Sequence, residues 1–399
     1  MIRLHVISPF HQVLTDARSH CAFGGRTRLF AKMMKEFGYE VIVYGNEPSD
    51  VVCSEFVPIL SAEEHARVYP PPGHGEFEDK NSTIGNEGWY MFAERTRSIL
   101  RDRAKPGDIV CHTFGQANAH LVRDVRQAIH VETFVGSNEP PFGAFRVFES
   151  ESWKHYTLGR FELMRHPATN EPLYVDEPGL AHNLCFVIPN ARDPGDWPLG
   201  TGEGDYCLFM GRLIKAKGLD TIANIIKAWD RKHPNDDMRF VFAGQGEISG
   251  LVEEVQKQSR ALMDRVDYRG VVTGRDRAKL IGDARCMLCP TNYVEPGGGS
   301  AIEALMCGTP VVASDWGCFT ESVRQGKNGF RCKTLADWIR GIEMCGSAGL
   351  PDVWRQDIRD DAEDRFSTEV AAPLYDRAFR QLRDILANGP ESTESFNVP

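Results

Sequence analysis

The segment from Glu295 to Glu303 has the most chemically informative spacing in the sequence. It reads Glu-Pro-Gly-Gly-Gly-Ser-Ala-Ile-Glu and follows an apolar run that ends at Pro290. Its three glycines let a ligand approach the backbone, and the helix predicted to begin there points amide N–H groups at an anion. Carboxylates on both sides suit a phosphate compound with a sugar near Glu295 and a ribose near Glu303. The residues between them include Gly297, Gly298, Gly299 and Ser300.

Two cations follow an earlier predicted strand at 206–211. Arg212 comes directly after this strand, and Lys217 stands just before the helix predicted over 218–232. Open parallel sheets bind ligands beyond the carboxyl ends of their strands. Two cations beside a helix N-terminus therefore predict a site for a phosphate or diphosphate.

The turn at 244–250 supports a competing interpretation. Its sequence, GQGEISG, nearly matches the dinucleotide turn G-x-G-x-x-G, but the third spacing is one residue too long. An NAD(P)-dependent oxidoreductase would also need an acidic residue at the end of the next strand, where Arg269 stands. We interpret Gly244 as part of a tight strand-to-helix turn. The oxidoreductase and a sugar-nucleotide epimerase remain the alternatives.

The rest of the sequence predicts the elements that position these residues. Short β-rich runs alternate with amphipathic helical patterns, which is typical of βαβ units and parallel sheets covered on both faces. Strands are expected at 2–8, 40–45, 108–113, 130–135 and 183–189, then at 206–211, 239–244, 266–270, 284–290, 309–314 and 329–332. Helices are expected at 26–38, 218–232, 301–307 and 368–386, and a long loop at 68–88.

The predicted fold class is α/β, with two facing Rossmann-like doubly wound domains and a C-terminal helix that crosses back to the first. A Gly-, Pro- and Asp-rich stretch at 190–206 separates the two series of strands. The predicted parts are an N-terminal domain over 1–193, a C-terminal domain over 194–366, a crossing helix over 367–387 and a flexible tail over 388–399.

Composition narrows the class of protein. The 399 residues carry a formal net charge of −10, which argues against a protein that mainly grips nucleic-acid backbone. No run approaches the ~20 apolar residues of a membrane span, and the N-terminus lacks a signal-peptide pattern. Eleven scattered cysteines fit free thiols in a cytoplasmic protein. The C-x-x-C pair Cys286 and Cys289 stands in a predicted strand, where the two side chains face opposite sides.

Five segments of the second half together resemble the nucleotide-sugar domain of retaining family-4 glycosyltransferases, which have the two-domain GT-B architecture. Their order and spacing agree with that family across roughly residues 200–335. The segments are GRLIKAKG (211–218), FAGQGE (242–247), EPGGGSAIE (295–303), GTPVVASDWG (308–317) and SVRQGKNGF (322–330). Gly297 departs from the pattern, because the family more often has phenylalanine there.

The resemblance implies a role for each matching residue. Arg212 and Lys217 would bind the diphosphate of a nucleotide-sugar donor, for which UDP-sugars are favoured, and would stabilise the leaving group. Glu295 would hold the transferred sugar, and Glu303 would hold the ribose hydroxyls. The other donor-side residues would be Gly244, Arg269, Gly270, Gly297, Gly298, Gly299 and Ser300.

The first half would then supply the acceptor side. Gly24 and Gly25 lead into the helix at 26–38, where the family has a glycine-rich turn beside the donor phosphate. A histidine that the family often carries is absent here, because the matching stretch at 133–136 reads Thr-Phe-Val-Gly. The candidate acceptor-side residues are His11, Asp16, His20 and His112, with Glu139 as a further local substitute.

The implied reaction is transfer of a sugar to an acceptor hydroxyl with retention, without a metal ion or other cofactor. The first half is similar to a subgroup associated with bacteriophage and bacterial genomes, in which acceptors include hydroxymethylated bases of DNA. Arg26, Arg28, Lys32 and Lys35 on one predicted helix would favour such an acceptor or a lipid one, whereas the net charge disfavours DNA. If the acceptor is not DNA, the expected acceptor is a glycan or a lipid. The sequence does not determine the sugar, the acceptor or the oligomeric state.

Overall fold

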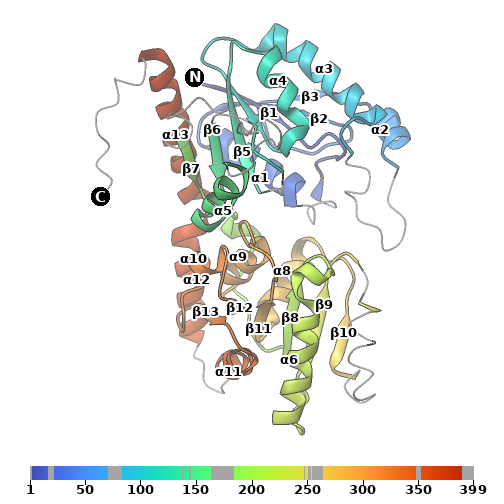
Figure 1. The fold of residues 1–399 in the computed structure, drawn as a ribbon, viewed down its shortest axis with the longest axis vertical. Helices are drawn as coiled ribbons and strands as arrows, with labels where there is room; N and C mark the ends of the chain where they lie inside the picture. The colour runs from blue at the N-terminus through green and yellow to red at the C-terminus, as the bar shows by residue number, and fades with distance from the viewer. Residues whose placement is uncertain are drawn as a thin grey trace, which may run out of the picture. The chain divides into compact units, whose positions relative to one another are not determined.

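The chain forms two compact units in a computed structural model that describes residues 2–16, 22–70, 83–136, 139–142, 145–162, 184–246, 248, 249, 253, 264–346 and 352–388. The first unit holds the described residues up to Pro189 together with the C-terminal helix, and the second holds those from Asn190 to Ser367. Each unit is a parallel sheet with helices on its faces (Figure 1). This confirms the predicted α/β class.

The first unit is built on a seven-stranded parallel sheet in the order β3-β2-β1-β4-β5-β6-β7. Its strands are β1 (Arg3–Ile7), β2 (Glu40–Gly45), β3 (Glu55–Pro58), β4 (Ile109–His112), β5 (Ile129–Val135), β6 (Phe145–Phe148) and β7 (Cys185–Val187). The central strands are buried along nearly their whole length, as expected for a sheet covered on both faces. The chain moves outward from β1 through β2 and β3 and then resumes at β4, so the topological switch point lies between β1 and β4.

Six helices belong to this unit, counted over its described residues: α1 (Ala22–Glu36), α2 (Ala62–Val68), α3 (Glu87–Arg103), α4 (Ala119–Asp124), α5 (Glu151–Glu162) and α13 (Thr368–Asn388). The last of these returns to the first unit, as predicted. Tyr375 on α13 packs edge-on against Phe30 of α1, with ring centroids 5.0 Å apart. Its neighbour Asp376 accepts a 2.6 Å hydrogen bond from the hydroxyl of Tyr39.

The second unit is built on a six-stranded parallel sheet in the order β10-β9-β8-β11-β12-β13. Its strands are β8 (Tyr206–Met210), β9 (Arg239–Ala243), β10 (Val266–Tyr268), β11 (Cys286–Cys289), β12 (Val311–Ser314) and β13 (Gly329–Cys332). Its helices are α6 (Leu219–Lys232), α8 (Gly274–Asp283), α9 (Gly299–Met306), α10 (Phe319–Ser322), α11 (Leu335–Gly346) and α12 (Asp352–Phe366). The switch point lies between β8 and β11.

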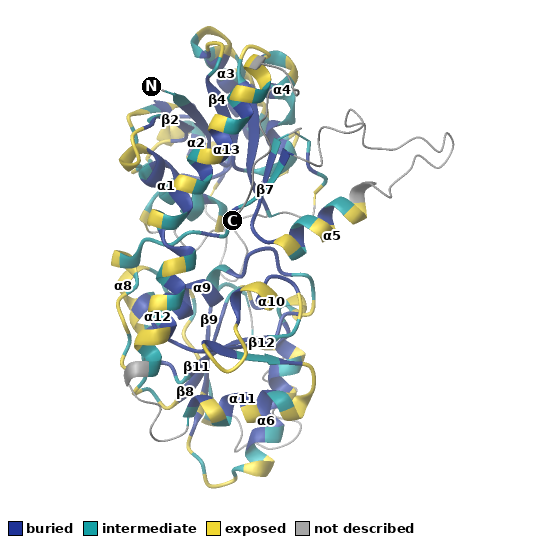
Figure 2. Cartoon of the chain, turned by 90° about the vertical axis from the view of Figure 1, so that its left-hand side faces the viewer, coloured by how far each residue is buried: buried dark blue, intermediate teal, exposed yellow. Residues whose placement is uncertain are grey.

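Alternation along the strands gives this sheet two hydrophobic cores, seen as buried strands between helices in Figure 2. Leu208 of β8 packs with α9 and α12 on one face, whereas Phe209 packs with α6 and α11 on the other. The predicted opposition of the C-x-x-C pair is confirmed, because Cys289 lies in the first core and Cys286 in the second. All ten described cysteines are free thiols.

The sequence analysis missed β3, β6 and eight helices, α2, α3, α4, α5, α8, α10, α11 and α12. β3 is a four-residue edge strand with little buried surface, and β6 contains the buried Arg146, so neither shows a clear apolar pattern. The loop predicted at 68–88 is shorter among the described residues, because α3 begins at Glu87; residues 71–82 lie outside them. Among the described helices, none is long and apolar enough to cross a membrane.

Candidate functional site

The loops that follow β8 and β11 meet at the switch point of the second unit. The backbone N–H of Asn292 donates a 2.8 Å hydrogen bond to the carbonyl of Ala216, which joins the two loops directly. Gly218 lies against Pro290 with φ at +86°, and a Cβ there would stand 1.9 Å from the Pro290 oxygen. Only glycine fits this approach, so the two loops are fixed side by side.

Lys217 and Glu295 form an ion pair across these two loops. The Lys217 Nζ lies 2.6 Å from Glu295 Oε2, and the two side chains are 19% and 12% exposed. The ammonium also lies 5.0 Å from the ring centroid of Tyr293. Burial lowers the pKa of Lys217, but the carboxylate of Glu295 and Tyr293 outweigh it and raise that pKa above its ordinary value. The lysine is therefore held as a cation at the sheet edge.

A third loop, after β12, fixes the backbone around Glu295. The N–H of Cys318 donates to the Glu295 carbonyl at 3.1 Å, and the Trp316 indole Nε1 donates to the Thr291 carbonyl at 2.9 Å. Gly317, with φ at +59°, brings its backbone so close that a Cβ would stand 2.8 Å from the Glu295 nitrogen. The carboxylate thus projects from a loop supported on both sides.

The glycine run opens α9 as the sequence predicted. Gly298 caps the helix with φ at +57°, and α9 begins at Gly299. A Cβ on Gly299 would meet Arg192 Nη2 at 2.7 Å, so the missing side chain makes room for that arginine. Gly297 belongs to the preceding loop, and Ser300 lies in the first turn of the helix. The N-terminus of α9 therefore stands beside both Glu295 and Arg192.

Glu303, one turn further into α9, is held between two arginines that the sequence analysis missed. Arg192 Nη2 lies 3.0 Å from Oε1, and Arg277 Nε lies 2.9 Å from Oε2. The carboxylate is only 8% exposed. Burial raises the pKa of Glu303, but Arg277 and Arg192 outweigh it and lower that pKa below its ordinary value. Glu303 is therefore ionised, with both carboxylate oxygens bound.

The remaining donor-side residues lie at the same edge of the sheet. Arg212 is exposed directly after β8, and Gly244 packs so tightly that a Cβ would stand 1.8 Å from the Gly211 oxygen. The Tyr268 hydroxyl donates to the carbonyls of Gly244 and Gly246, at 3.2 and 3.0 Å. These contacts explain the glycines by the tight packing of the turn, which is the interpretation that the sequence analysis favoured. Residues 247 and 250 of this turn lie outside the described residues.

Arg269 and Gly270 follow β10 at the outer side of this edge. Arg269 Nη2 lies 2.6 Å from Asp267 Oδ2, and the arginine side chain is 49% exposed. Gly270 adopts φ at +66° and accepts a 2.8 Å backbone hydrogen bond from Gly244. The structure thus places both residues beside the glycine turn, at the surface.

Four residues of the second unit have contacts that the sequence analysis did not anticipate: Arg192, Arg277, Tyr293 and Trp316. Arg192 stands in the stretch interpreted as a linker, and Arg277 belongs to a helix that was not predicted. Their pairing with Glu303 spans 111 and 26 residues, so no local spacing reveals it. Tyr293 lies within the same motif as Glu295 and could have been recognised there.

The acceptor-side candidates of the first unit do not form a single cluster among the described residues. His11 is 5% exposed, and its ring lies 5.0 Å from that of Phe114 beside the β1–β4 switch point. Asp16 is 87% exposed and pairs with Arg28. Gly24 and Gly25 lie in the first turn of α1, and His20 lies outside the described residues.

His112 lies inside the sheet, at the end of β4. It is 2% exposed, and its Nε2 lies 2.9 Å from Nδ1 of His130, whose own Nε2 lies 2.8 Å from the Val125 carbonyl. Burial, with His130 and His120 nearby, lowers the pKa of His112 well below its ordinary value. Glu139 Oε2 accepts a 3.1 Å hydrogen bond from the Gln116 backbone N–H.

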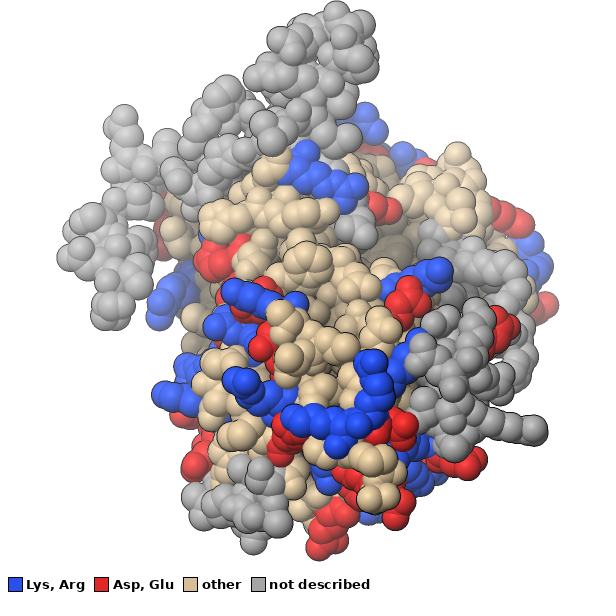
Figure 3. Space-filling view, turned by 60° about the horizontal axis from the view of Figure 1, so that its bottom comes forward, with Lys and Arg blue, Asp and Glu red and all other residues tan. Residues whose placement is uncertain are grey.

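The arginines of α1 are engaged by acidic partners. Arg26 pairs with Glu149 and lies 4.4 Å from the ring centroid of Phe134. Arg28 pairs with Asp16 and donates to the Asp50 carbonyl at 2.8 Å. On the face shown in Figure 3, lysines and arginines likewise lie next to aspartates and glutamates. No three His, Cys, Asp or Glu side chains of the described residues could jointly hold a metal ion.

The sheet edge of the second unit thus combines an exposed arginine, a paired lysine, a helix N-terminus and two buried carboxylates. Such a set can bind an anionic group and hold hydroxyl groups on both sides of it. Residues 204–345 match the family model described as Glycosyl transferases group 1, a span that covers Arg212 to Glu303 but less than half of the 399 residues.

Among curated relatives, the chain is 27% identical over 143 residues to spore coat protein SA of Bacillus subtilis, covering 35% of this chain and 38% of that protein. It is 33% identical over 122 residues to an uncharacterized glycosyltransferase of Methanocaldococcus jannaschii, covering 31% of this chain and 30% of that protein. The chain therefore spans only about a third of the length of these relatives.

A solved structure resembles the chain over nearly its whole length. It is that of the Anabaena protein HepE in complex with UDP and glucose, with a TM-score of 0.65 and 15% identity, and the match covers 96% of this chain and 100% of that one. The likeness shows that the two parallel-sheet units have the GT-B fold, as predicted.

Proposed function

We propose that the chain is a glycosyltransferase that transfers a sugar from a nucleotide-diphosphate donor to an acceptor hydroxyl with retention of configuration. The observation that carries this proposal is the Lys217–Glu295 ion pair, held across the switch point of the second unit beside the N-terminus of α9. The family match over 204–345 supports the reaction class, and the UDP-bound structural relative supports UDP-sugars as the first donors to test.

Each residue of the site has a role in this proposal. Arg212 and Lys217 neutralise the charge that develops on the leaving diphosphate, together with the amides at the start of α9. Glu295 orients the transferred sugar, and Glu303 accepts hydrogen bonds from the ribose hydroxyls. Because both oxygens of Glu303 already bind arginines, the ribose would share the carboxylate with Arg192 and Arg277. Retention then follows from attack on the face from which the diphosphate leaves.

We do not extend the proposal to a DNA acceptor. The helix predicted to offer a basic face, α1, has Arg26 and Arg28 paired with carboxylates, so those charges are already compensated. We place the enzyme in the cytoplasm, where free thiols like those of the ten described cysteines persist.

The proposal is tested by thermal stabilisation with UDP, GDP, UDP-glucose, NAD and NADP. A ligand that binds only the folded state raises Tm by mass action. At a ligand concentration of 100 Kd, the free energy of unfolding rises by about 2.7 kcal/mol. We expect a shift with one nucleoside diphosphate and its sugar. No shift with any nucleoside diphosphate, and a clear one with NAD or NADP, would overturn the proposal in favour of the oxidoreductase.

A matched pair of variants ties the shift to the site. Glu303→Gln removes a buried charge held by two arginines and should reduce the nucleotide-induced shift. Asp361→Asn removes a similar charge, held by Arg324 and Arg365 in the same unit but outside the site. Both variants should lower the basal Tm, but only Glu303→Gln should weaken nucleotide binding.

A further inference from the structure

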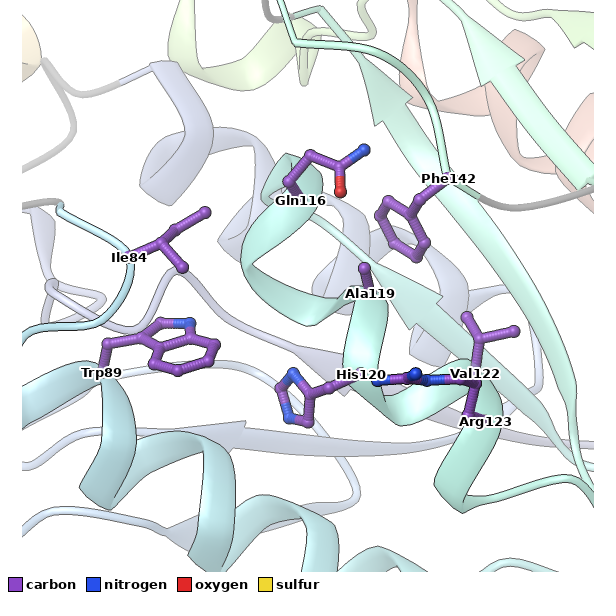
Figure 4. Close-up of a pocket in the computed structure, with 8 residues that line it drawn as sticks. All are labelled: Ile84, Trp89, Gln116, Ala119, His120, Val122, Arg123 and Phe142. Carbon is purple, nitrogen blue, oxygen red and sulfur yellow. The ribbon is translucent and has the colours of Figure 1, made fainter. Parts of the chain in front are cut away.

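The first unit contains a pocket of about 450 Å³ that none of the proposed roles uses (Figure 4). It lies beyond the ends of β4 and β5, the edge at which open parallel sheets bind ligands. Its volume is in the range of small-molecule sites. Its lining is formed by the apolar Ile84, Trp89, Ala119, Val122 and Phe142 and the polar Gln116, His120 and Arg123. We call it the Trp89 pocket.

The two aromatic walls of the Trp89 pocket are held in place from behind. The indole Nε1 of Trp89 donates a 3.0 Å hydrogen bond to the Ala117 carbonyl. The backbone N–H of Phe142 donates to the buried carboxylate of Glu132 at 2.7 Å, and the Phe142 ring packs edge-on against His112, with centroids 5.1 Å apart. The Trp89 ring also packs edge-on with the rings of Tyr90 and His120, with centroids 4.9 and 5.7 Å apart. These contacts fix the orientation of the two aromatic side chains, so the pocket is preorganised.

The lining offers few hydrogen bonds to a ligand. The indole N–H of Trp89 is already used, and the Gln116 side-chain Nε2 donates to the Pro140 carbonyl at 2.6 Å. The ring nitrogens of His120, also in the lining, are buried, so the accessible donors are mainly those of Arg123. A polyhydroxylated sugar would therefore replace only part of its hydrogen bonds to water, which is costly. A planar aromatic ring loses none, and it gains stacking contact with Trp89 and Phe142.

Arg123 places a positive charge at the rim of the pocket, which favours a ligand with an anionic group. Its side chain is exposed, and no carboxylate of the described residues pairs with it. A guanidinium in this setting binds a carboxylate or phosphate with two parallel hydrogen bonds. The lining thus combines an apolar slot for a ring with one cation beside it.

We propose that the Trp89 pocket binds the acceptor through an aromatic ring that carries an anionic substituent. That this ligand is the acceptor rests on the proposed function. The pocket and the chemistry of its ligand are defined by residues of the first unit alone. The reacting hydroxyl would belong to the same molecule as the ring.

The test is binding of three probes to the full chain, followed by saturation-transfer NMR. 4-Hydroxybenzoate has the ring and the anion, 4-methylphenol has the ring alone, and methyl α-glucoside represents a sugar acceptor. We expect 4-hydroxybenzoate to bind most tightly, 4-methylphenol about tenfold more weakly, and methyl α-glucoside not to bind in the Trp89 pocket.

Variants assign the binding to the pocket. Trp89→Ala should weaken both aromatic probes by about tenfold, whereas Arg123→Gln should weaken 4-hydroxybenzoate alone. Because Trp89→Ala also removes a hydrogen bond to Ala117, its fold is checked by circular dichroism, and Arg123→Gln provides an independent result at an exposed position. Phe37→Ala is the matched control, since Phe37 is an aromatic residue of the same unit that is 43% exposed and does not belong to the lining.

Three outcomes would overturn the inference: no binding of either aromatic probe, equal binding to wild type and both pocket variants, or tighter binding of methyl α-glucoside with the same dependence on Trp89. The probes bind without any nucleotide. Failure here with an intact UDP or GDP shift would therefore refute the pocket's role, and loss of the nucleotide shift alone would refute the proposed reaction.

Discussion

The two units have the same kind of topological switch point, but different types of side chain line it. In the second unit, the β8–β11 edge is lined by glycines and by charges that are already paired, Lys217 with Glu295 and Glu303 with two arginines. In the first unit, the β1–β4 edge is lined by rings: Phe114 packs against both Phe10 and His11. One edge carries glycines and paired charges, and the other carries packed aromatic rings.

The difference between the two edges follows from what charged and aromatic side chains need in the absence of a ligand. Charged side chains at low exposure need partners, so the second unit fixes Lys217 and Glu295 as an ion pair and a ligand must share it. Aromatic side chains need none, so the first unit can leave a pocket open beside Trp89. The predictions below separate these two designs.

The largest expected effect is the loss of turnover in Lys217→Ala. In the proposed reaction, removing the cation deprives the leaving diphosphate of a neutralising group, and it leaves Glu295 without its partner. By comparison with the loss of a single charge-stabilising group in other enzymes, turnover should fall by about 10²- to 10³-fold. Initial rates of nucleotide release at saturating donor measure this.

Lys215→Ala is the control for that variant, because Lys215 is exposed in the same short turn. Its rate should stay within about twofold of wild type, since a solvated lysine contributes little. If Lys217→Ala kept more than a tenth of the wild-type rate, the charged edge would not be the reaction centre.

A smaller effect, on stability, should distinguish the tightly packed edge from an open turn. Gly218 and Gly38 both have positive φ, +86° and +106°. A Cβ would clash with the Pro290 oxygen at Gly218, whereas nothing lies within 4 Å at Gly38. Gly38→Ala should cost about 1 kcal/mol of backbone strain, and Gly218→Ala about 3 kcal/mol. Denaturant unfolding measures both, and equal losses would contradict the packing argument.

Acid should weaken the first unit before the second. Burial lowers the pKa of His5, His112, His120 and His130, all in the first unit. Because these folded-state pKa values lie below the unfolded value near 6.5, the unfolded chain takes up protons first as the pH falls. Stability is then lost from about pH 6.5 downward, by up to ~1.4 kcal/mol per pH unit for each histidine.

In the second unit, the lowered pKa of Glu303 acts only at more acidic pH. Its contribution is present above the unfolded value of about 4.3 and is lost as the pH falls through the folded value. Hydrogen exchange at pH 7 and pH 5.5, corrected for intrinsic rates, should therefore show lost protection in β4 and β5 but not in β8 and β11. Equal loss in both sheets would be the contrary result.

The charged edge could be read from the sequence far better than the aromatic one, and the reason is physical. A helix N-terminus after a glycine run, as at Gly298, is a local feature whose function depends on backbone geometry alone. The same holds for Lys217, which stands in the short turn between β8 and α6. These positions were predicted because their chemistry is encoded within a few residues.

The contacts that tune those residues are not local. Arg192 pairs with Glu303 across 111 residues, and Trp89 donates to Ala117 from a helix that was not predicted. His112 was an acceptor-side candidate from its place after a strand, but the structure buries it behind Phe142. Which side chains cover one another depends on tertiary packing, and a single sequence does not specify it.

The smallest expected effect concerns Arg269, at the outer side of the charged edge. Its ion pair with Asp267 is half exposed, so Arg269→Ala should change the free energy of unfolding by less than about 0.5 kcal/mol. Arg239 pairs with the same carboxylate at 3.5 Å, but it begins β9 and therefore lies at the opposite end of the strands. Arg239→Ala is thus a matched control for the lost ion pair.

If Arg269 contacts the base of the donor, its variant alone should weaken nucleotide binding, by about threefold in a calorimetric titration. Equal affinity in the two variants would exclude Arg269 from the donor site and leave the loops that carry Lys217 and Glu295, with Glu303 on α9, to form it.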